Sequence, residues 1–248
     1  ILHYVENDQL LADGDLLLVD AAAEYRPLTS DITRTFPVNG RFSRPQREVY
    51  ELVLRAQQDV ISMCRPGLPF TDMHTRAVEV LSAGLVELGL LPGTAEEVVA
   101  KGWYRRFFFH GTGHWLGIDV HDAGTSRVEG AGRLLAPGMA FTVEPGVYVA
   151  RDTAAVTLSH AEYDPDERMR LAFELGAEGA KAEFERREQE AGTFEFEVPT
   201  QYLGIGVRIE DDLLITAEGY ENLSALSPVE PDAVEVLCAE ESTLPLFD

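Results

Sequence analysis

The pattern of apolar and polar residues predicts two strands near the start of the chain. Residues 16–20 (LLLVD) form a short apolar run after the turn Asp13-Gly14-Asp15, and residues 31–38 (DITRTFPV) alternate between polar and apolar positions. Both patterns are typical of β-strands. Their order along the chain predicts a hairpin with a long loop.

Two amphipathic helices are predicted next. A capping-box pattern begins at Ser43, and apolar residues then recur at helical spacing until the Pro-Gly pair at 66–67. A second periodic stretch runs from Thr71 to about Gly89, with its apolar residues on one face. We expect both helices to cover a sheet.

Two later strands are predicted at residues 139–149 (MAFTVEPGVYV) and 206–215 (GVRIEDDLLI). Residues 151–199 between them are different in character. Residues 164–167 (DPDE) are typical of a helix start, and the chain is then rich in Glu, Arg, Ala and Lys to about Ala191. This composition predicts an exposed helical insertion. A solvated surface excursion is the simpler interpretation, and a lid, a gate or an oligomer contact is the alternative.

A weak internal repeat relates the two pairs of strands. In each pair, an apolar run ends on an acid six residues after a glycine, and a later strand carries a second acid. The repeat indicates a pseudo-twofold arrangement in which the acids converge at the centre. These acids are Asp20 and Asp31 in the first pair, and Glu144 and Glu210 in the second.

Composition sets the class of protein. The 248 residues are 45% hydrophobic, which is enough for a sizeable core, and we expect a single domain over residues 1–248. The formal net charge of -23 argues against nucleic acid or an anionic membrane as partner.

The compartment and the thiols follow from the same composition. No apolar run is long enough for a membrane span and no signal peptide pattern is visible, so we expect a cytoplasmic protein. Cys64 and Cys238 are interpreted as ordinary thiols. The chain opens inside an apolar pattern without Met, and we expect that an N-terminal part is missing.

Four carboxylates at the ends of apolar strands need positive charge nearby, because burial of an unpaired charge is costly. Arg34 and Arg208 could pair with one or two of them, which is the purely structural interpretation. Two divalent cations would balance all four acids, with a neutral imidazole as a fifth protein ligand.

The stretch at residues 110–122 (HGTGHWLGIDVHD) offers three imidazoles: His110, His114 and His121. Its glycines argue against a helix and favour a loop or an edge strand. In that setting one imidazole could bind metal while the others hold substrate or move protons. The spacing alone does not say which histidine is the ligand.

Five local contexts occur in a fixed order: LVDAAAEY, SDITRTFPVNG, HGTGHWLGIDVHD, TVEPGVY and GVRIEDD. Together they resemble the pita-bread metallopeptidases, most closely the aminopeptidase P (Xaa-Pro aminopeptidase) group, with prolidase as near neighbour. The resemblance runs to about Leu223 and is broken by the insertion. It implies the α+β pita-bread fold, a curved antiparallel sheet with a pseudo-twofold repeat covered by helices.

The resemblance also implies a dinuclear site that holds Mn(II) in first place, with Co(II), Fe(II) or Zn(II) as alternatives. Asp20 would chelate one ion, and Asp31 and Glu210 would bridge the two. The remaining two ligands, which complete the other ion, would be His114 and Glu144.

Further roles follow from the same resemblance. A metal-bridging hydroxide would attack the bond before proline, and Glu144 would take the proton of the water. His121 and His3 would assist proton transfer and His110 would contact substrate. The guanidinium that positions a bridging ligand or the substrate would be that of Arg208.

The implied activity is release of the N-terminal residue from peptides with proline at the second position. Trp115 and Tyr148 are candidates for an apolar wall around the proline, or else ordinary packing residues. Prolidase activity and a metal-free pita-bread module that binds peptides or proteins remain as alternatives. Creatinase-like and methionine aminopeptidase functions fit less well, and a homo-oligomer is left open.

Overall fold

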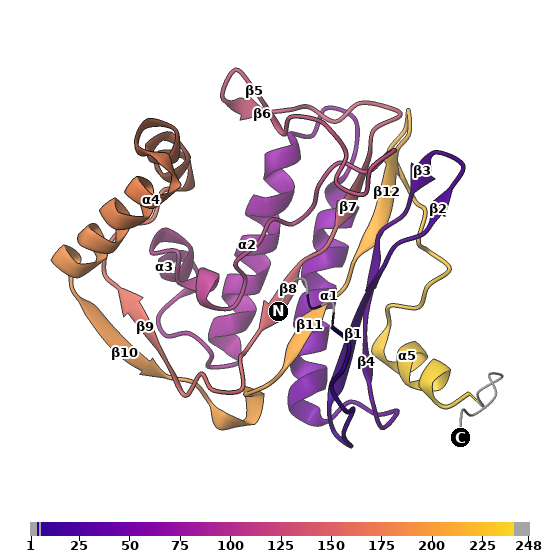
Figure 1. Cartoon of the computed structure of the whole chain (residues 1–248), viewed down its shortest axis with the longest axis horizontal. Coiled ribbons are helices and arrows are strands. Elements are labelled where there is room, and N and C mark those ends of the chain that lie inside the picture. The colour runs from indigo at the N-terminus through magenta and orange to yellow at the C-terminus, as the bar shows by residue number, and fades with distance from the viewer. Residues whose placement is uncertain (1–3, 5, 241–248) are drawn as a thin grey trace.

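A computed structural model describes residues 4 and 6–240 of the chain. Two long helices, α1 (Arg44–Met63) and α2 (Phe70–Glu87), lie side by side behind the strands (Figure 1). They bury their apolar faces in the main core, as the helical spacing predicts. The two helices approach closely at Gly84, where a Cβ atom would lie 2.1 Å from the side chain of Leu52.

The predicted N-terminal hairpin is confirmed. Strand β1 (Leu16–Ala21) pairs antiparallel with β4 (Ile32–Pro37), in a register that sets Asp20 opposite Thr33. The long loop between them contains the short pair β2 (Glu24–Tyr25) and β3 (Leu28–Thr29).

The start of α1 is also as predicted. The N–H of Ser43 donates to Oε1 of Gln46 over 2.8 Å, which satisfies a backbone donor before the first turn. Two short helices that follow α2 are absent from the prediction: α3 (Ala95–Ala100) and the 3-10 helix η1 (Trp103–Arg106). Segments of six and four residues are too short to show a helical period.

The two later strands are interrupted, so the expectation of continuous strands is wrong. The first divides around Glu144 and Pro145, and the second around Ile209 and Glu210. Pro145 has no N–H for a ladder hydrogen bond. The segments are β7 (Ala140–Val143), β8 (Gly146–Tyr148), β11 (Gly206–Arg208) and β12 (Asp211–Ile215), and β12 also pairs with β13 (Tyr220–Asn222).

The insertion contains the predicted helix and also two strands that the sequence prediction lacked. Strands β9 (Ala155–Ser159) and β10 (Thr193–Glu197) pair antiparallel and carry α4 (Pro165–Ala191) at their end. Helix α4 is kinked at Gly176, and of its side chains only Ala180 is buried. It lies apart from α1 and α2 in Figure 1, as an exposed excursion should.

Shorter elements complete the part of the chain that the structure describes. They are the hairpin β5 (Arg127–Val128) with β6 (Ala131–Gly132), the 3-10 helix η2 (Thr200–Tyr202), and helix α5 (Pro231–Cys238). Among the described helices, none combines the length and apolar character that a membrane crossing requires.

Candidate metal centre

One pocket brings together the side chains that the sequence singles out. Eight of the nine predicted site residues fall within the described chain and converge there, and the ninth, His3, lies outside the described residues. The pocket is lined by Asp20, Asp31, His110, Gly111, Gly113, His114, His121, Glu144, Arg208 and Glu210.

The acids come from places where the strands end or are interrupted. Asp31 directly precedes β4, while Glu144 and Glu210 occupy the two strand breaks. The stretch that contains His114 has no helix and is joined to β7 through the isolated bridge between Trp115 and Phe141. The expectation of a loop or edge strand is therefore confirmed.

The possible ligand atoms form overlapping groups. In each group one oxygen or nitrogen per residue lies within 4.8 Å of the others. Glu210 belongs to two groups, which together contain all five predicted ligands. The groups are Asp20, Asp31 and Glu210; His114, Glu144 and Glu210; and Asp31, His114 and His121.

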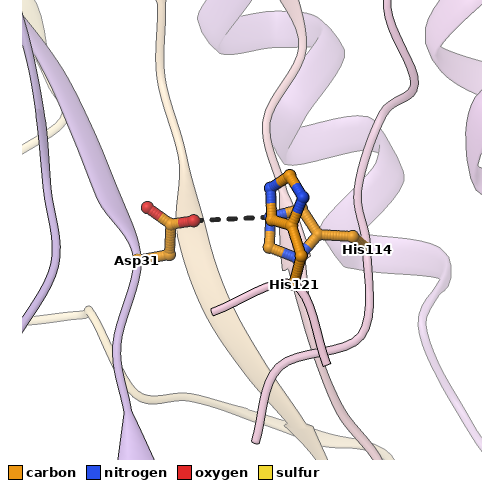
Figure 2. Close-up of side chains that lie close together, drawn as sticks. All are labelled: Asp31, His114 and His121. Atoms are coloured by element: carbon orange, nitrogen blue, oxygen red, sulfur yellow. Dashed lines mark ion pairs between the residues drawn. The ribbon is translucent and has the colours of Figure 1, made fainter. Parts of the chain in front are cut away.

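The imidazole of His114 is oriented for metal binding through Nε2. Its Nδ1 lies 3.0 Å from the carbonyl oxygen of Trp115, which can only accept, so Nδ1 carries the proton. Its Nε2 then faces Asp31 at 3.4 Å and Glu144 at 3.7 Å. Figure 2 shows the carboxylate of Asp31 directed at this ring, and the ring of His121 lies 4.0 Å from it between centroids.

Only one of the four carboxylates forms a salt bridge with an arginine. The guanidinium of Arg208 donates to Asp20 over 2.5 Å. The guanidinium of Arg34 instead pairs with Asp211 at 2.7 Å. Within the described chain, the other three acids have no Lys or Arg nitrogen within 4.0 Å, so salt bridges alone do not explain this site.

The pKa values show the same shortage of positive charge. Burial, followed by the charges of neighbouring acids, raises the pKa of Glu210 to about 8. Burial, with the charges of Asp31 and Asp20, raises that of Glu144 to about 7. Burial and Asp31 raise the pKa of Asp20 as well. These acids share protons unless cations lie between them, and a carboxylate-rich set with one imidazole fits hard divalent cations.

The pKa values of Asp31 and His114 shift in opposite directions. Burial alone would raise the pKa of Asp31, but the hydrogen bond and charge of His114 lower it. For His114, burial is outweighed by the hydrogen bond to Asp31, and its pKa is raised to about 9. The two groups thus behave as an ion pair at neutral pH.

A chain of hydrogen bonds through His110, Tyr148 and Arg208 lies beside these acids. Burial lowers the pKa of His110 to about 4, so its imidazole is neutral. Its Nδ1 donates to the carbonyl of Gly111 over 2.7 Å, and its Nε2 therefore accepts from the hydroxyl of Tyr148 over 2.9 Å. That hydroxyl oxygen accepts in turn from Arg208 over 3.2 Å.

Trp115 does not line this pocket, so of the two interpretations left open by the sequence, ordinary packing is the one that fits it. Its ring packs against Phe70 at 4.3 Å between centroids, and Arg133 lies over its face. The reason is alternation: Trp115 follows His114 in an extended segment, so the two side chains point to opposite sides.

A comparison with family models identifies the relationship: the model of metallopeptidase family M24 matches residues 1–217. The chain belongs to metallopeptidase family M24. This M24 chain is 40% identical over 237 residues to a Xaa-Pro aminopeptidase of Escherichia coli, covering 96% of this chain and 44% of that protein. It is 34% identical over 241 residues to human Xaa-Pro aminopeptidase 3, covering 97% and 38%.

Solved structures agree with the M24 assignment. Proline aminopeptidase P II from Yersinia pestis matches with a TM-score of 0.76 and 43% identity, over 96% of the M24 chain and 45% of that chain. Aminopeptidase P from E. coli with the inhibitor Pro-Leu matches with a TM-score of 0.76 and 40% identity, over 96% and 44%. The M24 chain therefore spans less than half the length of these relatives.

The structure of the M24 chain also reveals three supporting residues that the sequence prediction missed. Thr33 Oγ1 donates to Glu210 over 2.6 Å, Asp31 N–H donates to Asp212 over 3.0 Å, and His114 N–H donates to Thr142 Oγ1 over 3.1 Å. Each lies two positions from a predicted ligand, where alternation places side chains on one side. That period-two signal could have found them.

Proposed function

We propose that this chain carries the catalytic site of a dinuclear metallo-aminopeptidase, which releases the N-terminal residue from peptides with proline at the second position. The observation that carries the proposal is the pair of ligand groups that share Glu210 inside one pocket. Relatives named Xaa-Pro aminopeptidases, about 40% identical over nearly the whole chain, support the substrate class.

The ligand groups suggest how two ions would be held. Asp20, Asp31 and Glu210 would hold one ion, and His114, Glu144 and Glu210 the other, with Asp31 as a second bridging ligand. Two divalent cations at this site would polarise the scissile carbonyl and activate a water molecule for attack. The oxygen-rich donor set favours Mn(II), with Co(II), Fe(II) or Zn(II) as alternatives.

Glu144 is suited to move protons during the reaction. It belongs to the ligand group with His114 and Glu210, so its carboxylate would lie beside the water that the ions activate and could accept that proton and later donate it. The nitrogen released from an Xaa-Pro bond is a secondary amine, which must be protonated to leave. We assign that donation to Glu144 with His121, whose ring lies beside His114, and we assign His3 to the same proton transfer from the sequence resemblance alone.

Arg208 and His110 have positioning roles in this proposal. The guanidinium fixes Asp20 and the hydroxyl of Tyr148 at once, and Tyr148 fixes the ring of His110. His110 is neutral and lies at the pocket wall, where it can contact the substrate without adding charge.

The fold belongs to the same proposal. We propose the pita-bread arrangement for residues 1–248 as one domain, with 151–199 as an insertion. Its support is that the β1 and β4 hairpin supplies two acids and the interrupted pair of later strands supplies the other two.

The test is hydrolysis of an Xaa-Pro-Yaa tripeptide and an Xaa-Pro dipeptide by the metal-stripped chain, with and without added Mn(II). Mn(II)-dependent release of Xaa from the tripeptide is the expected result. Cleavage of the dipeptide alone would assign prolidase activity instead. Binding of two ions without cleavage of either peptide would overturn the peptidase proposal for this chain, and failure to bind ions would overturn the metal site.

A further inference from the structure

A histidine outside the pocket contacts the glycine-rich segment that forms one pocket wall. His74 lies on α2, and its Nδ1 is 2.9 Å from Oγ1 of Thr112. Its ring packs against Phe108 at 5.5 Å between centroids. Burial lowers the pKa of His74, so a neutral imidazole makes this contact at neutral pH. The interaction joins the helical layer to the wall of the pocket.

Thr112 connects this contact to two of the proposed ligands. The residue is 2% exposed, and its carbonyl oxygen accepts from the N–H of Glu144 over 2.8 Å. His114 follows two positions later and lines the pocket, whereas the Thr112 hydroxyl contacts His74 of α2. Between them, a Cβ atom at Gly113 would lie 2.0 Å from the carbonyl oxygen of Thr142, so the segment lies tightly against β7.

The segment needs such external contacts because it has no regular secondary structure of its own. Gly111 and Gly113 flank Thr112, and glycine has more backbone freedom to lose than any other residue. A hydrogen bond from a buried helix restricts that freedom. Ligands that are held in place before binding give tighter metal sites than mobile ones.

We propose that His74 is a positioning residue for the metal centre. Through Thr112 it fixes the segment that presents His114 and the carbonyl that holds the backbone of Glu144. This inference rests on the proposed dinuclear site. It concerns the affinity of the metal held by His114 and Glu144, and not the chemical step.

The experiment measures Mn(II) affinity and stoichiometry, by electron paramagnetic resonance of free Mn(II), at a temperature where every variant is folded. Thr112→Val removes the hydroxyl and keeps the shape, and His74→Phe removes Nδ1 and keeps the ring. We expect each variant to bind one of the two Mn(II) ions about tenfold more weakly, as is typical when a supporting hydrogen bond to a metal ligand is lost. The double variant should be no weaker than either single variant.

Two conservative variants and one matched control complete the design. Thr112→Ser keeps the hydroxyl, and His74→Asn places an amide atom close to the position of Nδ1, so both should bind Mn(II) like the unchanged chain. As the control, Ser82→Ala removes a buried hydroxyl on α2 that has no hydrogen-bond partner in the described part of the chain. It should leave both ions unaffected.

The outcomes separate this inference from the proposed function. Unchanged Mn(II) affinity in Thr112→Val and His74→Phe, with only the melting temperature lowered, would assign a purely structural role and overturn the inference. If His74→Phe does not fold, the Thr112→Val and Thr112→Ser pair decides alone. If the chain without any substitution binds no Mn(II), the proposal of the metal site itself is overturned.

Discussion

Glu144 and Glu210 stand opposite each other at the point where both of their strands are interrupted. The pairs Val143 with Asp211 and Gly146 with Arg208 lie on either side in a single register, so no residue is inserted at the break. The N–H of each glutamate turns to a threonine carbonyl elsewhere: Thr112 at 2.8 Å for Glu144, and Thr33 at 3.1 Å for Glu210. Because each glutamate N–H bonds to a segment outside its own strand pair, four chain segments meet at this point.

Removal of a shared ligand should remove the metal pair. Glu210→Gln keeps the size of the side chain but removes its charge, and Glu210 belongs to two ligand groups. We expect fewer than two Mn(II) ions per chain and loss of peptide cleavage, measured by metal analysis after dialysis and by peptide hydrolysis. Asp31→Ala should have the same effect. Two tightly bound ions in either variant would refute the ligand assignment.

The metal-stripped chain should become less stable as the pH rises. The pKa of Glu144 is raised from 4.5 to about 7 and that of Glu210 to about 8, so the folded chain binds more protons than the unfolded chain in this window. His114, with its pKa raised from 6.5 to about 9, acts in the same direction. The lowered pKa of Asp31 acts in the opposite direction only near and below its ordinary value of 3.8, and the lowered pKa values of His110 and His74 do so only below their ordinary value of 6.5.

We therefore expect the melting temperature of the stripped chain to fall between about pH 7 and about pH 9. Added Mn(II) should raise it more at about pH 8 than at about pH 5, because the ligands must release protons to bind the ion. Scanning calorimetry with and without Mn(II) measures both effects. A melting temperature of the stripped chain that rises across this range would show that the acids are not crowded as described.

The hydroxyl of Thr33 should matter for the metal although it is not a ligand. It donates to Glu210 over 2.6 Å and accepts from Arg208 over 3.1 Å, so it holds one oxygen of the shared carboxylate in place. Thr33→Val should weaken Mn(II) binding about tenfold, while Thr33→Ser should retain it. Equal Mn(II) affinity of these two variants in a calorimetric titration would exclude the role.

Tyr148 should affect turnover more than metal content. Its hydroxyl links His110 to Arg208, and neither belongs to the ligand groups. Loss of this link in Tyr148→Phe should lower kcat/KM about threefold to tenfold, since an ordinary hydrogen bond contributes about 1 kcal/mol. Steady-state kinetics with metal analysis would check this, and a loss of bound ions would contradict it.

Helix α4 of the insertion should be dispensable for folding. Replacement of residues 165–191 by a short Gly-Ser linker between Asp164 and Gly192 removes one buried side chain, that of Ala180. We expect circular dichroism to show a folded chain and Mn(II) binding to be retained. Kinetics on peptides of several lengths would then distinguish a plain excursion from a lid, because removal of a lid should change the preference for peptide length.

Most of the site could be predicted from the sequence because metal binding requires particular residue types, which the sequence shows directly. Asp20, Asp31, His114, Glu144 and Glu210 all occur in short contexts with recognisable strand or loop character, and all five reach one pocket. The partners of the two arginines could not be predicted. Arg34 and Arg208 lie in similar strand contexts, and only the tertiary arrangement sends one to Asp211 and the other to Asp20.

The fold was harder to predict from the sequence than the site. The failures lie where a strand loses its hydrogen-bond partner or pairs with a distant segment. The apolar pattern of residues 139–149 continues through Glu144, so nothing local predicts that its N–H leaves the ladder for Thr112. The strands β9 and β10 were missed because the polar helix between them dominates the composition of the insertion. Their pairing depends on two segments that are distant in sequence.

The two ends of the insertion meet in space. The N–H of Val198 donates to the carbonyl of Ala154 over 3.0 Å, and β9 and β10 pair antiparallel from there to the base of α4. Because loop closure depends only weakly on loop length, on the order of tens of residues can be gained or lost here at little cost in folding. Insertions and deletions can therefore accumulate at this one position during evolution, while the register of the strands that carry the acids stays the same.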